Sequence, residues 1–452
     1  MNTQQKVCII GAGSSGIAAC KVFQEYGIPF DCYEKGSQIG GNWRYENDNG
    51  VSSAYRSLHI NTSRDVMAYS DFPMPDDYPM FPHHSQIIRY FDSYVDHFGF
   101  RDKIQFNTSV IDVKPEADGS YTVTTDKGNT ENYSWVMVAN GHHWNPRYPD
   151  PPFKGQFNGE TMHVHYYKTP DVLENKNVLI IGFGNSAVDV ACEAARLHTG
   201  NVFLSTRSGA YVVPNYIMGI PFDTLATPSL SKMPIWFQRA ILNFSLWLAR
   251  GPQEAYGVPK PKRKILSEHP TLSQDFLNLA GRGKVKVKPN VQELAGDEVV
   301  FEDGSREKID IIIYATGYKV TFPFLSADHF KPLKVEETND IQLYRRVLHP
   351  DYPGLFFLGL VQPLGAIMPL AEVQAIYAAK LISGEVSLPS KEAMQKDIED
   401  TRQKVAKRYK KSVRHTLQVD FFPYKESVER EMRKYATGKK VQKFKVNKPM
   451  PA

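Results

Sequence analysis

The chain has 452 residues, which is long enough for two or three domains with a proper core in each. A hydrophobic content of 42% and a charged content of 23% are ordinary for a soluble globular protein, and no apolar run approaches the length of a membrane-spanning helix. The formal net charge of +5 is small, so the local distribution of charge carries more information than the total.

The four cysteines fall inside strand and helix patterns. They are Cys8, Cys20, Cys32 and Cys192, and they form no CxxC pair and have no histidine at metal-ligand spacing. We therefore expect reduced core thiols, as in a cytoplasmic protein, and no metal site.

A dinucleotide-binding pattern opens the chain. Val7–Ile10 is an apolar run typical of a strand buried on both faces of a parallel sheet, and Gly11, Gly13 and Gly16 turn it into a helix. In this spacing the first glycine allows a tight turn, the second lets a pyrophosphate approach the backbone, and the third lets helix and strand pack closely. The pyrophosphate is expected at the helix N-terminus.

A second apolar run, Phe30–Tyr33, ends at Glu34. This is close to the expected distance for the acid that binds a ribose hydroxyl. The alternative is an ordinary βαβ unit without a nucleotide, which the spacing and the acid together disfavour.

After Glu34 we expect two loops, followed by a helix and three strands. Residues 37–50 form a loop rich in Gly and Asn that could cover a cofactor, and Tyr55–His84 is a loop of a length that is usually functional. We then expect a helix over Ser85–Phe98 and strands over Ile104–Val113, Tyr121–Thr125 and Trp135–Val138.

The opening pattern repeats after a proline-rich connection. Val178–Ile181 is a predicted buried strand, Gly182 and Gly184 turn it, and Asn185–Leu197 is a predicted helix. Ala187 stands in place of the third glycine, a replacement that the fingerprint tolerates.

The strand after this helix, Val202–Ser205, is followed by Thr206 and Arg207 and not by an acid. A carboxylate there pairs with a 2′-hydroxyl but repels a 2′-phosphate, whereas arginine offers the phosphate a bidentate partner. We therefore predict FAD in the first unit and NADPH in the second. The alternative for Arg207 is a solvated charge at a strand end.

The remaining chain is harder to interpret. Met233–Arg250 has broad helical spacing and few charges, and it could cover a substrate entrance, touch a membrane surface, pack on another subunit or be a plain core helix. Further on we expect a hairpin and a buried strand from Val299 to Tyr314, a strand over Phe356–Gly359 and a helix over Pro369–Ile382 whose N-terminus could point at the flavin.

The tail after Ser390 is expected to be helical and charged. It ends in a run of lysines without acids, Lys439, Lys440, Lys443, Lys445 and Lys448. A solvated arm explains these lysines better than a nucleic-acid patch, because no aromatic interleaving accompanies them.

This order predicts an α/β protein with two dinucleotide-binding Rossmann-like domains, the NADPH domain inserted into the FAD domain. We place the first part of the FAD domain at residues 1–160 and the NADPH domain at 161–317, with an insertion at about 211–287. The second part of the FAD domain and the C-terminal helical tail occupy 318–452.

The residues resemble those of the flavin-containing monooxygenases, flavoprotein oxygenases that oxidise nitrogen and sulfur. Phe157, Gly159, His163 and Tyr167 match the family pattern F-x-G-x-x-x-H-x-x-x-Y/F between the two glycine motifs. Other similar stretches are GGNW at 40–43, NTS at 61–63, ATGY at 315–318 and GLVQPLGAIMPL at 359–370. The likeness to eukaryotic members includes the insertion, but their hydrophobic C-terminal anchor is absent, so we expect a soluble bacterial relative.

The resemblance implies an NADPH- and O₂-dependent monooxygenase with FAD. Reduced flavin would form a C4a-hydroperoxyflavin, stabilised by bound NADP⁺, that oxygenates a tertiary amine, a thioether or indole. Asn61 matches the family's active-site asparagine, beside flavin and nicotinamide, where an amide can donate and accept hydrogen bonds without titrating. His163 matches a histidine that positions the two domains. The resemblance also implies a homodimer, and we expect neither a nucleic-acid partner nor a membrane span.

The predicted cofactor-binding residues come from the two fingerprints and the similar stretches: Gly11, Gly13, Ser15, Gly16, Glu34, Asn42, Trp43, Asn61, Thr62, Val110, Gly182, Gly184, Asn185, Ser186, Ser205, Thr206, Arg207 and Gln362.

Four other functions compete with this one. A Baeyer–Villiger oxygenase would attack ketones, and an NADPH oxidase would release hydrogen peroxide. A disulfide reductase needs a redox-active cysteine pair that the four cysteines do not offer. A flavin-binding sensor or scaffold would form no oxygenated product.

Overall fold

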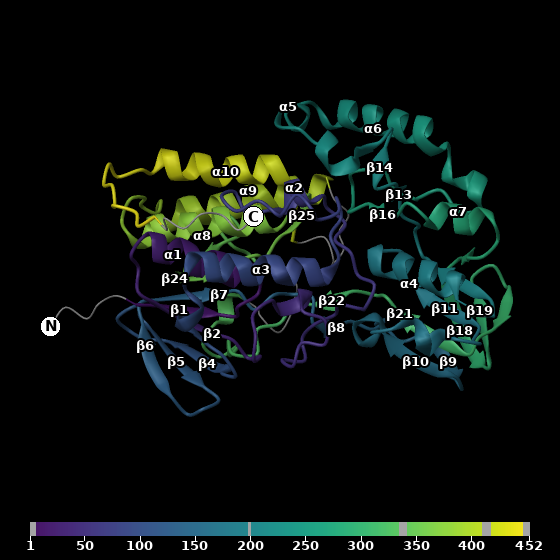
Figure 1. Ribbon diagram of the computed structural model, residues 1–452, viewed down its shortest axis with the longest axis horizontal. Helices are drawn as coiled ribbons and strands as arrows, with labels where there is room; N and C mark the ends of the chain where they lie inside the picture. The colour runs from purple at the N-terminus through teal and green to yellow at the C-terminus, as the bar shows by residue number, and fades with distance from the viewer. Residues whose placement is uncertain (1–5, 198–199, 334–340, 409–416, 446–452) are drawn as a thin grey trace. The chain divides into compact units, whose positions relative to one another are not determined.

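The computed structural model describes residues 6–197, 200–333, 341–408 and 417–445 (Figure 1). The chain divides into two compact units. Unit 1 comprises residues 1–54, 58–145 and 319–452, and unit 2 comprises 55–57 and 146–318. Unit 2 is thus inserted between segments of unit 1, and the predicted α/β class with two Rossmann-like domains is confirmed. The assignment of FAD to residues 1–160 and 318–452 and of NADPH to 161–317 stays a prediction.

A six-stranded sheet forms the centre of unit 1, in the order β23-β24-β7-β1-β2-β3. The strands are β1 (Val7–Ile10), β2 (Phe30–Tyr33), β3 (Ile104–Gln105), β7 (Trp135–Val138), β23 (Leu348–His349) and β24 (Tyr352–Phe357). All neighbours are parallel except β23 and β24. The predicted strands at the start of the chain are confirmed.

The two faces of β1 pack against different layers because side chains alternate along a strand. Val7 and Ile9 belong to a core that includes residues of the helices α1 (Ser14–Glu25), α3 (His84–Phe98), α8 (Met368–Ile382) and α10 (Phe421–Lys434). Cys8 and Ile10 face a core that includes a three-stranded sheet of β4 (Val110–Pro115), β5 (Tyr121–Thr125) and β6 (Thr130–Tyr133). Figure 1 shows the helices and this small sheet on opposite sides of the central sheet.

The single strand predicted over Ile104–Val113 is wrong. The chain forms β3 and β4 in different sheets, with a break at Asn107, whose φ is +51°. At the break the Asn107 N–H donates to Gly36 O at 3.0 Å and the Thr108 N–H donates to Glu34 O at 2.9 Å. Long-range bonds to the segment after β2 therefore end the strand.

Unit 2 contains a five-stranded parallel sheet in the order β10-β21-β11-β12-β17. Its strands are β10 (Glu160–His163), β11 (Val178–Ile181), β12 (Val202–Ser205), β17 (Lys286–Lys288) and β21 (Ile311–Tyr314), and α4 (Asn185–Arg196) connects β11 to β12. A second sheet joins β9 (Lys154–Phe157), β18 (Val291–Gly296), β19 (Glu298–Phe301) and β20 (Arg306–Lys308), which confirms the predicted hairpin.

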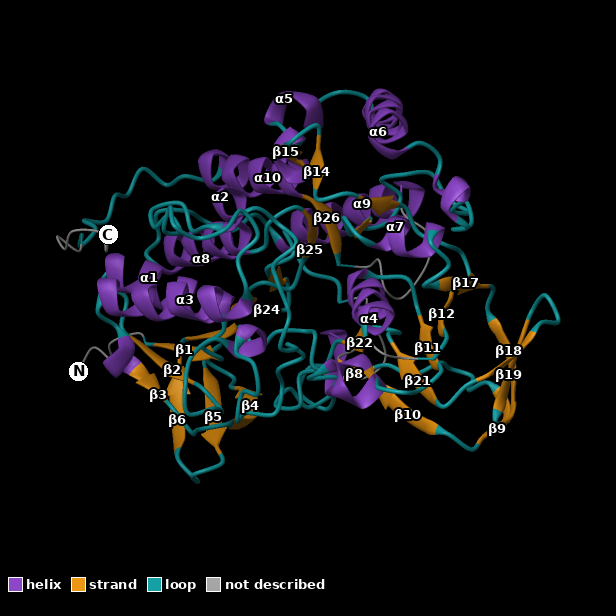
Figure 2. Ribbon diagram, turned by 45° about the vertical axis from the view of Figure 1, so that its right-hand side comes forward, coloured by secondary structure: helices purple, strands orange, loops and turns teal. Residues whose placement is uncertain are grey.

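The insertion has a small core of its own, around Val213, Ile217, Leu246, Ile265 and Leu272. It contains β13 (Val212–Val213), β14 (Tyr216–Ile217), β15 (Ile220–Pro221), β16 (Thr271–Leu272), α5 (Pro228–Ser231), α6 (Ile235–Arg250) and α7 (Phe276–Gly281). Figure 2 shows α5 and α6 at the end of the insertion that is far from the five-stranded sheet.

Helix α6 confirms the helix predicted from Met233, but it is not a core helix. Among its residues only Leu246 is buried, whereas Trp236, Phe244 and Trp247 are each more than 60% exposed. The polar Arg239 points inward, and its guanidinium donates to Ile265 O at 2.9 Å and to Ser267 Oγ at 2.7 Å. The helix therefore presents its apolar face outward. No helix of the described residues is long and apolar enough to cross a bilayer.

The charged tail is helical as predicted, with α9 (Lys391–Arg408) and α10. The described lysines of the arm, Lys439, Lys440, Lys443 and Lys445, are exposed as predicted, and the arm also contacts the rest of unit 1. Lys439 Nζ donates to Ser383 O at 2.6 Å, and the Phe444 N–H donates to Glu25 O at 2.7 Å, so the arm follows the surface of unit 1. Lys448 lies outside the described residues.

Asp189 of α4 links the helix to Tyr55, whose hydroxyl donates to its carboxylate. Burial raises the pKa of Asp189 to about 6, against about 3.8 when it is solvated. A carboxyl group whose pKa is raised by folding favours the folded state below the unfolded pKa. That contribution is lost as the pH rises through about 6.

We therefore expect Asp189→Asn to stabilise the protein at pH 8 by roughly 2 kcal/mol and to have little effect at pH 4, because the amide carries no charge to desolvate. Thermal unfolding of the wild type and the variant between pH 4 and 8 measures the difference. Glu174→Gln, at an exposed position of the same unit, is the control. A difference in stability between the wild type and Asp189→Asn that is the same at every pH would contradict the raised pKa of Asp189.

Candidate dinucleotide-binding sites

The first glycine loop connects β1 to α1, and two of its glycines are sterically required. Gly11 has φ +101°, and a Cβ there would lie 2.8 Å from Ala139 O. A Cβ on Gly16 would lie 1.9 Å from Gly11 O, inside the turn itself. The loop can therefore close only with glycine at both positions.

The N-terminus of α1 is open in the way that an anion requires. Gly13 is the N-cap, no side chain caps the helix, and the first turn contains no acid. A Cβ on Gly13 would meet nothing closer than Gly41 Cα, at 3.7 Å. Free N–H groups and the helix dipole favour a phosphate at such an end, so these residues fit the pyrophosphate of a dinucleotide.

Glu34 lies beside this loop, with only 3% of its surface exposed. Its carboxylate accepts hydrogen bonds from Ala12 N at 2.7 Å, Gly36 N at 2.9 Å and Asn49 Nδ2 at 3.1 Å. These bonds fix the carboxylate at the edge of the sheet where a ribose would lie next to a pyrophosphate on α1. Asn49 is a partner that the sequence analysis missed.

The segment with Asn42 and Trp43 forms a short 3₁₀ helix, η1 (Gly41–Trp43), against the glycine loop. The Gly40 N–H donates to Ala12 O at 3.0 Å, which places the segment there. Asn42 Oδ1 accepts from the N–H of Ser53 at 2.7 Å and from its hydroxyl at 2.8 Å. The side-chain amide oxygen of Asn42 therefore stabilises its own loop.

Asn61 and Thr62 precede the short helix α2 (Arg64–Met67); Asn61 is half-buried and Thr62 is buried. The Ile60 N–H donates to Pro82 O at 3.0 Å, and the Arg64 N–H donates to Met80 O at 2.8 Å. Asn61 thus lies on a loop that is fixed on both sides.

Two buried side chains that the sequence analysis missed, those of Tyr69 and Glu372, hold the segment that follows α2 in place. The Tyr69 hydroxyl donates to Ser14 O, in the first turn of α1, at 2.6 Å. Glu372 of α8 accepts from Ser70 N at 3.0 Å, and its pKa is raised by burial. No local pattern marks either residue, because their partners lie 55 and 302 positions away.

Ser15 faces the segment that leads to Gln362. A Cβ on Gly359 would lie 2.1 Å from Ser15 Oγ, so this glycine is needed for the close approach. Gln362 follows in β25 (Gln362–Leu364), which pairs with β26 (Gln418–Asp420). Val110 begins β4, after the Thr108 N–H bond to Glu34 O. Unit 1 therefore gathers the first loop, Glu34, η1 and the start of β4 at one end of its sheet.

The second glycine loop repeats this geometry in unit 2. Gly182 has φ +133°, and a Cβ there would lie 2.4 Å from Ala315 O. Gly184 is the N-cap of α4, again without a side-chain cap or an acid in the first turn. These residues also fit a pyrophosphate. The side chain of Asn185, however, accepts from Leu272 N at 2.8 Å and so holds the insertion.

The three polar residues at the end of β12 lie in different surroundings. Ser205 is buried, and its hydroxyl donates to Pro289 O at 2.8 Å. Thr206 Oγ1 accepts from Gly209 N at 3.0 Å, and Arg207 is exposed. Thr206 and Arg207 therefore remain available to a ligand, while Ser205 supports the strand end.

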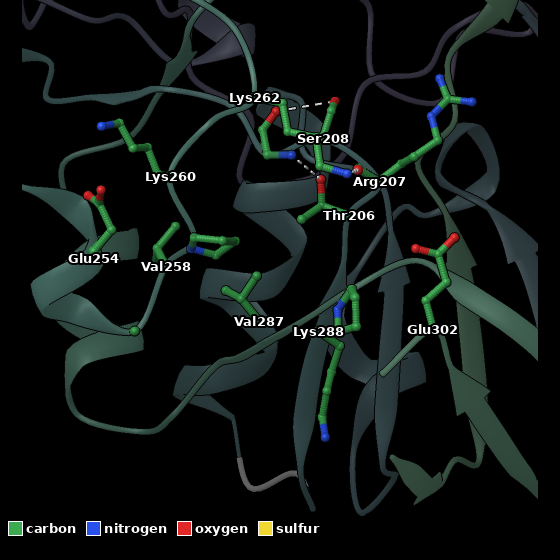
Figure 3. Close-up of a pocket in the computed structure, with 14 residues that line it drawn as sticks. Thr206, Arg207, Ser208, Glu254, Val258, Lys260, Lys262, Val287, Lys288 and Glu302 are labelled. Carbon is green, nitrogen blue, oxygen red and sulfur yellow. Dashed lines mark hydrogen bonds between the residues drawn. The ribbon is translucent and has the colours of Figure 1, made fainter. Parts of the chain in front are cut away.

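A pocket of about 380 Å³ opens beside this strand end (Figure 3). Its walls come from residues 206–209, from the segments 254–262 and 287–289, and from Glu302. Three lysines, Lys260, Lys262 and Lys288, line it with Arg207, against two acids, Glu254 and Glu302. A basic pocket at the carboxyl end of a parallel strand fits the phosphorylated end of a dinucleotide. The sequence analysis did not identify the residues of segment 254–262.

The histidine of the linker pattern, His163, is fully buried at the end of β10. Its Nε2 lies 3.0 Å from Gly317 O, and its Nδ1 accepts from the N–H of His165 at 3.1 Å. Burial lowers the pKa of His163 to about 4, so the ring is neutral at physiological pH. These bonds give His163 a local structural role in unit 2.

The four cysteines are buried free thiols, and burial raises the pKa of Cys192 to about 12. A thiol with a raised pKa is a poor nucleophile. Among the residues with described positions, no group of three or more His, Cys, Asp or Glu side chains is placed to hold a metal ion.

Comparison with known proteins yields a consistent set of matches. Residues 4–439 match the family model described as "Flavin-binding monooxygenase-like". Flavin-containing monooxygenase 5 of Cavia porcellus is 40% identical over 450 residues, which cover 94% of this chain and 82% of that protein.

Two further proteins are similar over most of the chain. Dimethylaniline monooxygenase [N-oxide-forming] 2 of Mus musculus is 36% identical, with 93% of this chain and 81% of that protein covered. The solved structure of S-allyl-L-cysteine S-oxygenase from Allium sativum superposes with a TM-score of 0.70 at 25% identity, over 95% of this chain and 88% of that one.

We expect Glu34→Gln to lower the affinity for a bound flavin dinucleotide by about a hundredfold, because the amide turns an NH₂ group toward donors that now face a carboxylate. The flavin content of the purified protein and the dissociation constant of added FAD measure this. Glu46→Gln, an exposed position in the neighbouring loop, should change neither. Full flavin content in the Glu34 variant would show that the carboxylate only supports the loop.

Proposed function

The chain belongs to the flavin-binding monooxygenase-like family, and from this membership we propose that it is an NADPH- and O₂-dependent flavoprotein monooxygenase that oxygenates soft nucleophiles. It is an oxidoreductase with FAD and NADPH as cofactors. The proposal rests mainly on the match of residues 4–439 to one family model. It is supported by the two glycine loops, which lead to uncapped helix N-termini, and by the strand that follows each helix, which leads to an acid in unit 1 and to an arginine in unit 2.

The proposed substrates are tertiary amines and thioethers. The mouse relative is named for forming the N-oxide of dimethylaniline, and the garlic protein is named for oxygenating the sulfur of S-allyl-L-cysteine. Both names describe attack at a nitrogen or sulfur atom with a lone pair. Indole shares the electron-rich character and is a further candidate.

FAD would bind in unit 1 and NADPH in unit 2. The first glycine loop and the N-terminus of α1 would hold the FAD pyrophosphate, and Glu34 would hold its ribose. The second loop and α4 would hold the NADPH pyrophosphate, with Thr206 and Arg207 at its 2′-phosphate. The bound flavin supplies the oxygen chemistry, with reducing equivalents from NADPH.

The chain's own task is to exclude water and stray protons from the flavin, and we assign this task to Asn61. Its amide can donate and accept hydrogen bonds but does not titrate, so it delivers no proton. The loop of Asn61 is held by backbone bonds to Pro82 and Met80 and by the Tyr69 hydroxyl, which donates to Ser14 O of α1. A fixed loop suits a residue that must keep one position through a catalytic cycle.

A substrate panel tests the function. The purified yellow protein is supplied with NADPH, air and either trimethylamine, methyl phenyl sulfide or cyclohexanone, and NADPH loss, product and hydrogen peroxide are measured. We expect N-oxide or sulfoxide in near-equal amount to NADPH consumed. A lactone as the main product would assign Baeyer–Villiger chemistry, and peroxide alone would assign an oxidase.

We expect Asn61→Ala to uncouple the reaction. NADPH oxidation continues, but product formed per NADPH falls by about tenfold and hydrogen peroxide rises to match, because water and protons gain access to the flavin. Oxygen uptake, product and peroxide measured together give the ratio.

The control for this variant is Asp65→Asn, which removes a charge from an exposed side chain of the adjacent helix α2. It should keep the wild-type ratio. An Asn61 variant with unchanged product per NADPH would remove Asn61 from the catalytic role.

A further inference from the structure

Residues 55–57 belong to unit 2, although the chain on either side of them belongs to unit 1. We call these three residues the crossing segment. Its backbone is bonded inside unit 2, because the Arg56 N–H donates to Lys168 O at 2.9 Å. The buried rings of Tyr55 and Tyr167 also lie 5.9 Å apart. The crossing segment is therefore packed into unit 2 and is not a free connection.

Both acids of α4 bond to this segment or to its neighbour Tyr167. Asp189 and Glu193 are four residues apart and so lie on the same face of the helix. The Tyr55 hydroxyl donates to the Asp189 carboxylate, and the Ser57 hydroxyl donates to one oxygen of Glu193. The other oxygen of Glu193 accepts from the Tyr167 hydroxyl. Hydrogen bonds to carboxylates are stronger than those between neutral groups, so these bonds fasten the segment to α4.

The same helix begins at the second glycine loop. Gly184 is its N-cap, five residues before Asp189, and this uncapped end fits a pyrophosphate. A helix is a rigid element, so a constraint placed on its N-terminus reaches the acids one to two turns further along. Helix α4 therefore connects a candidate dinucleotide site to the crossing segment.

The crossing segment leads directly to Asn61, which follows Ser57 by four residues. Between them, Leu58 O accepts from the His84 N–H at 2.9 Å, and the Ile60 N–H donates to Pro82 O at 3.0 Å. The backbone before Asn61 is thus held in two places. One is the pairing with residues 82–84, and the other is the fastening of residues 55–57 to α4.

We propose that Asp189 and Glu193 are positioning residues for Asn61. By holding the crossing segment on α4, they keep the Asn61 loop in its shielding position while NADP⁺ is bound at the N-terminus of the same helix. The inference rests on the proposed function. It gives a role to both acids of α4 and to Tyr167, the last residue of the linker pattern.

Tyr55→Phe tests the proposal, because it removes one hydroxyl and keeps the packed ring. With methyl phenyl sulfide as substrate, product per NADPH should fall by about threefold and hydrogen peroxide should rise to match. Flavin content and the affinity for NADP⁺ should stay within about twofold of the wild type, because neither glycine loop is changed. Asp189→Asn keeps an oxygen that can accept from the Tyr55 hydroxyl, so it should keep the wild-type ratio.

The matched control is Tyr344→Phe. It breaks the same kind of bond, from a buried tyrosine hydroxyl to the Glu431 carboxylate, inside unit 1. It should lower the melting temperature and leave product per NADPH unchanged. If Tyr344→Phe lowers this ratio as much as Tyr55→Phe does, the effect is general loss of stability and the proposal is overturned.

A double variant tests whether Tyr55 acts through Asn61. Tyr55→Phe combined with Asn61→Ala should lower product per NADPH no further than Asn61→Ala alone, because the position of an absent side chain has no effect. A ratio that falls by the product of the two single effects would contradict the proposal. A wild type that forms no oxygenated product would instead mean that the proposed function has failed.

Amide hydrogen exchange decides the proposal without turnover. The flavin-loaded protein is measured with NADP⁺, and peptides from residues 58–64 should exchange about tenfold faster in Tyr55→Phe than in the wild type. Ser57→Ala, at an exposed position, should give a smaller rise and covers the case in which Tyr55→Phe does not fold. Tyr344→Phe should give none. Faster exchange confined to residues 55–57, or no change, overturns the proposal.

Discussion

The hydrogen bond from Ala12 N to the Glu34 carboxylate, at 2.7 Å, is the interaction on which the first site depends. It ties the glycine loop after β1 to the end of β2, and the same carboxylate draws in Gly36 and Asn49. Because parallel strands place their carboxyl ends on one edge, one buried acid can order the turn, the helix N-terminus and the neighbouring loop together. Burial of so polar a group is tolerable only because all three donors are present.

Unit 2 uses the same scaffold with the opposite charge. Gly182 and Gly184 reproduce the turn and the open helix end, but the strand end carries Thr206 and Arg207 where unit 1 has Glu34. The Lys262 ammonium group, from a segment 55 residues further along the chain, donates to Arg207 O at the same strand end. One fold thus offers an acidic and a basic candidate site, and this difference in charge is the physical basis for proposing two cofactors of different phosphate content.

The features that were predicted correctly are those that depend on residues close together in the sequence. The strands β1, β2, β7, β11 and β12, the glycine turns and helix α6 follow from periodicity and from the conformations that only glycine adopts. The break at Asn107, the contact of Asn185 with Leu272 and the position of Lys262 depend on partners far away in the chain, and no residue pattern near them carries that information. For the α6 segment the sequence left an exposed apolar face and a core helix as alternatives, because periodicity identifies a stripe but not the layer that it faces.

The most direct test of the account is the fate of molecular oxygen. The purified flavoprotein is incubated with NADPH, ¹⁸O₂ and methyl phenyl sulfide or trimethylamine, and the product is analysed by mass spectrometry. We expect one ¹⁸O atom in each sulfoxide or N-oxide molecule and close to one product per NADPH consumed. Unlabelled substrate with all the label in hydrogen peroxide or water would contradict it, because the protein would then reduce oxygen without transferring an atom of it.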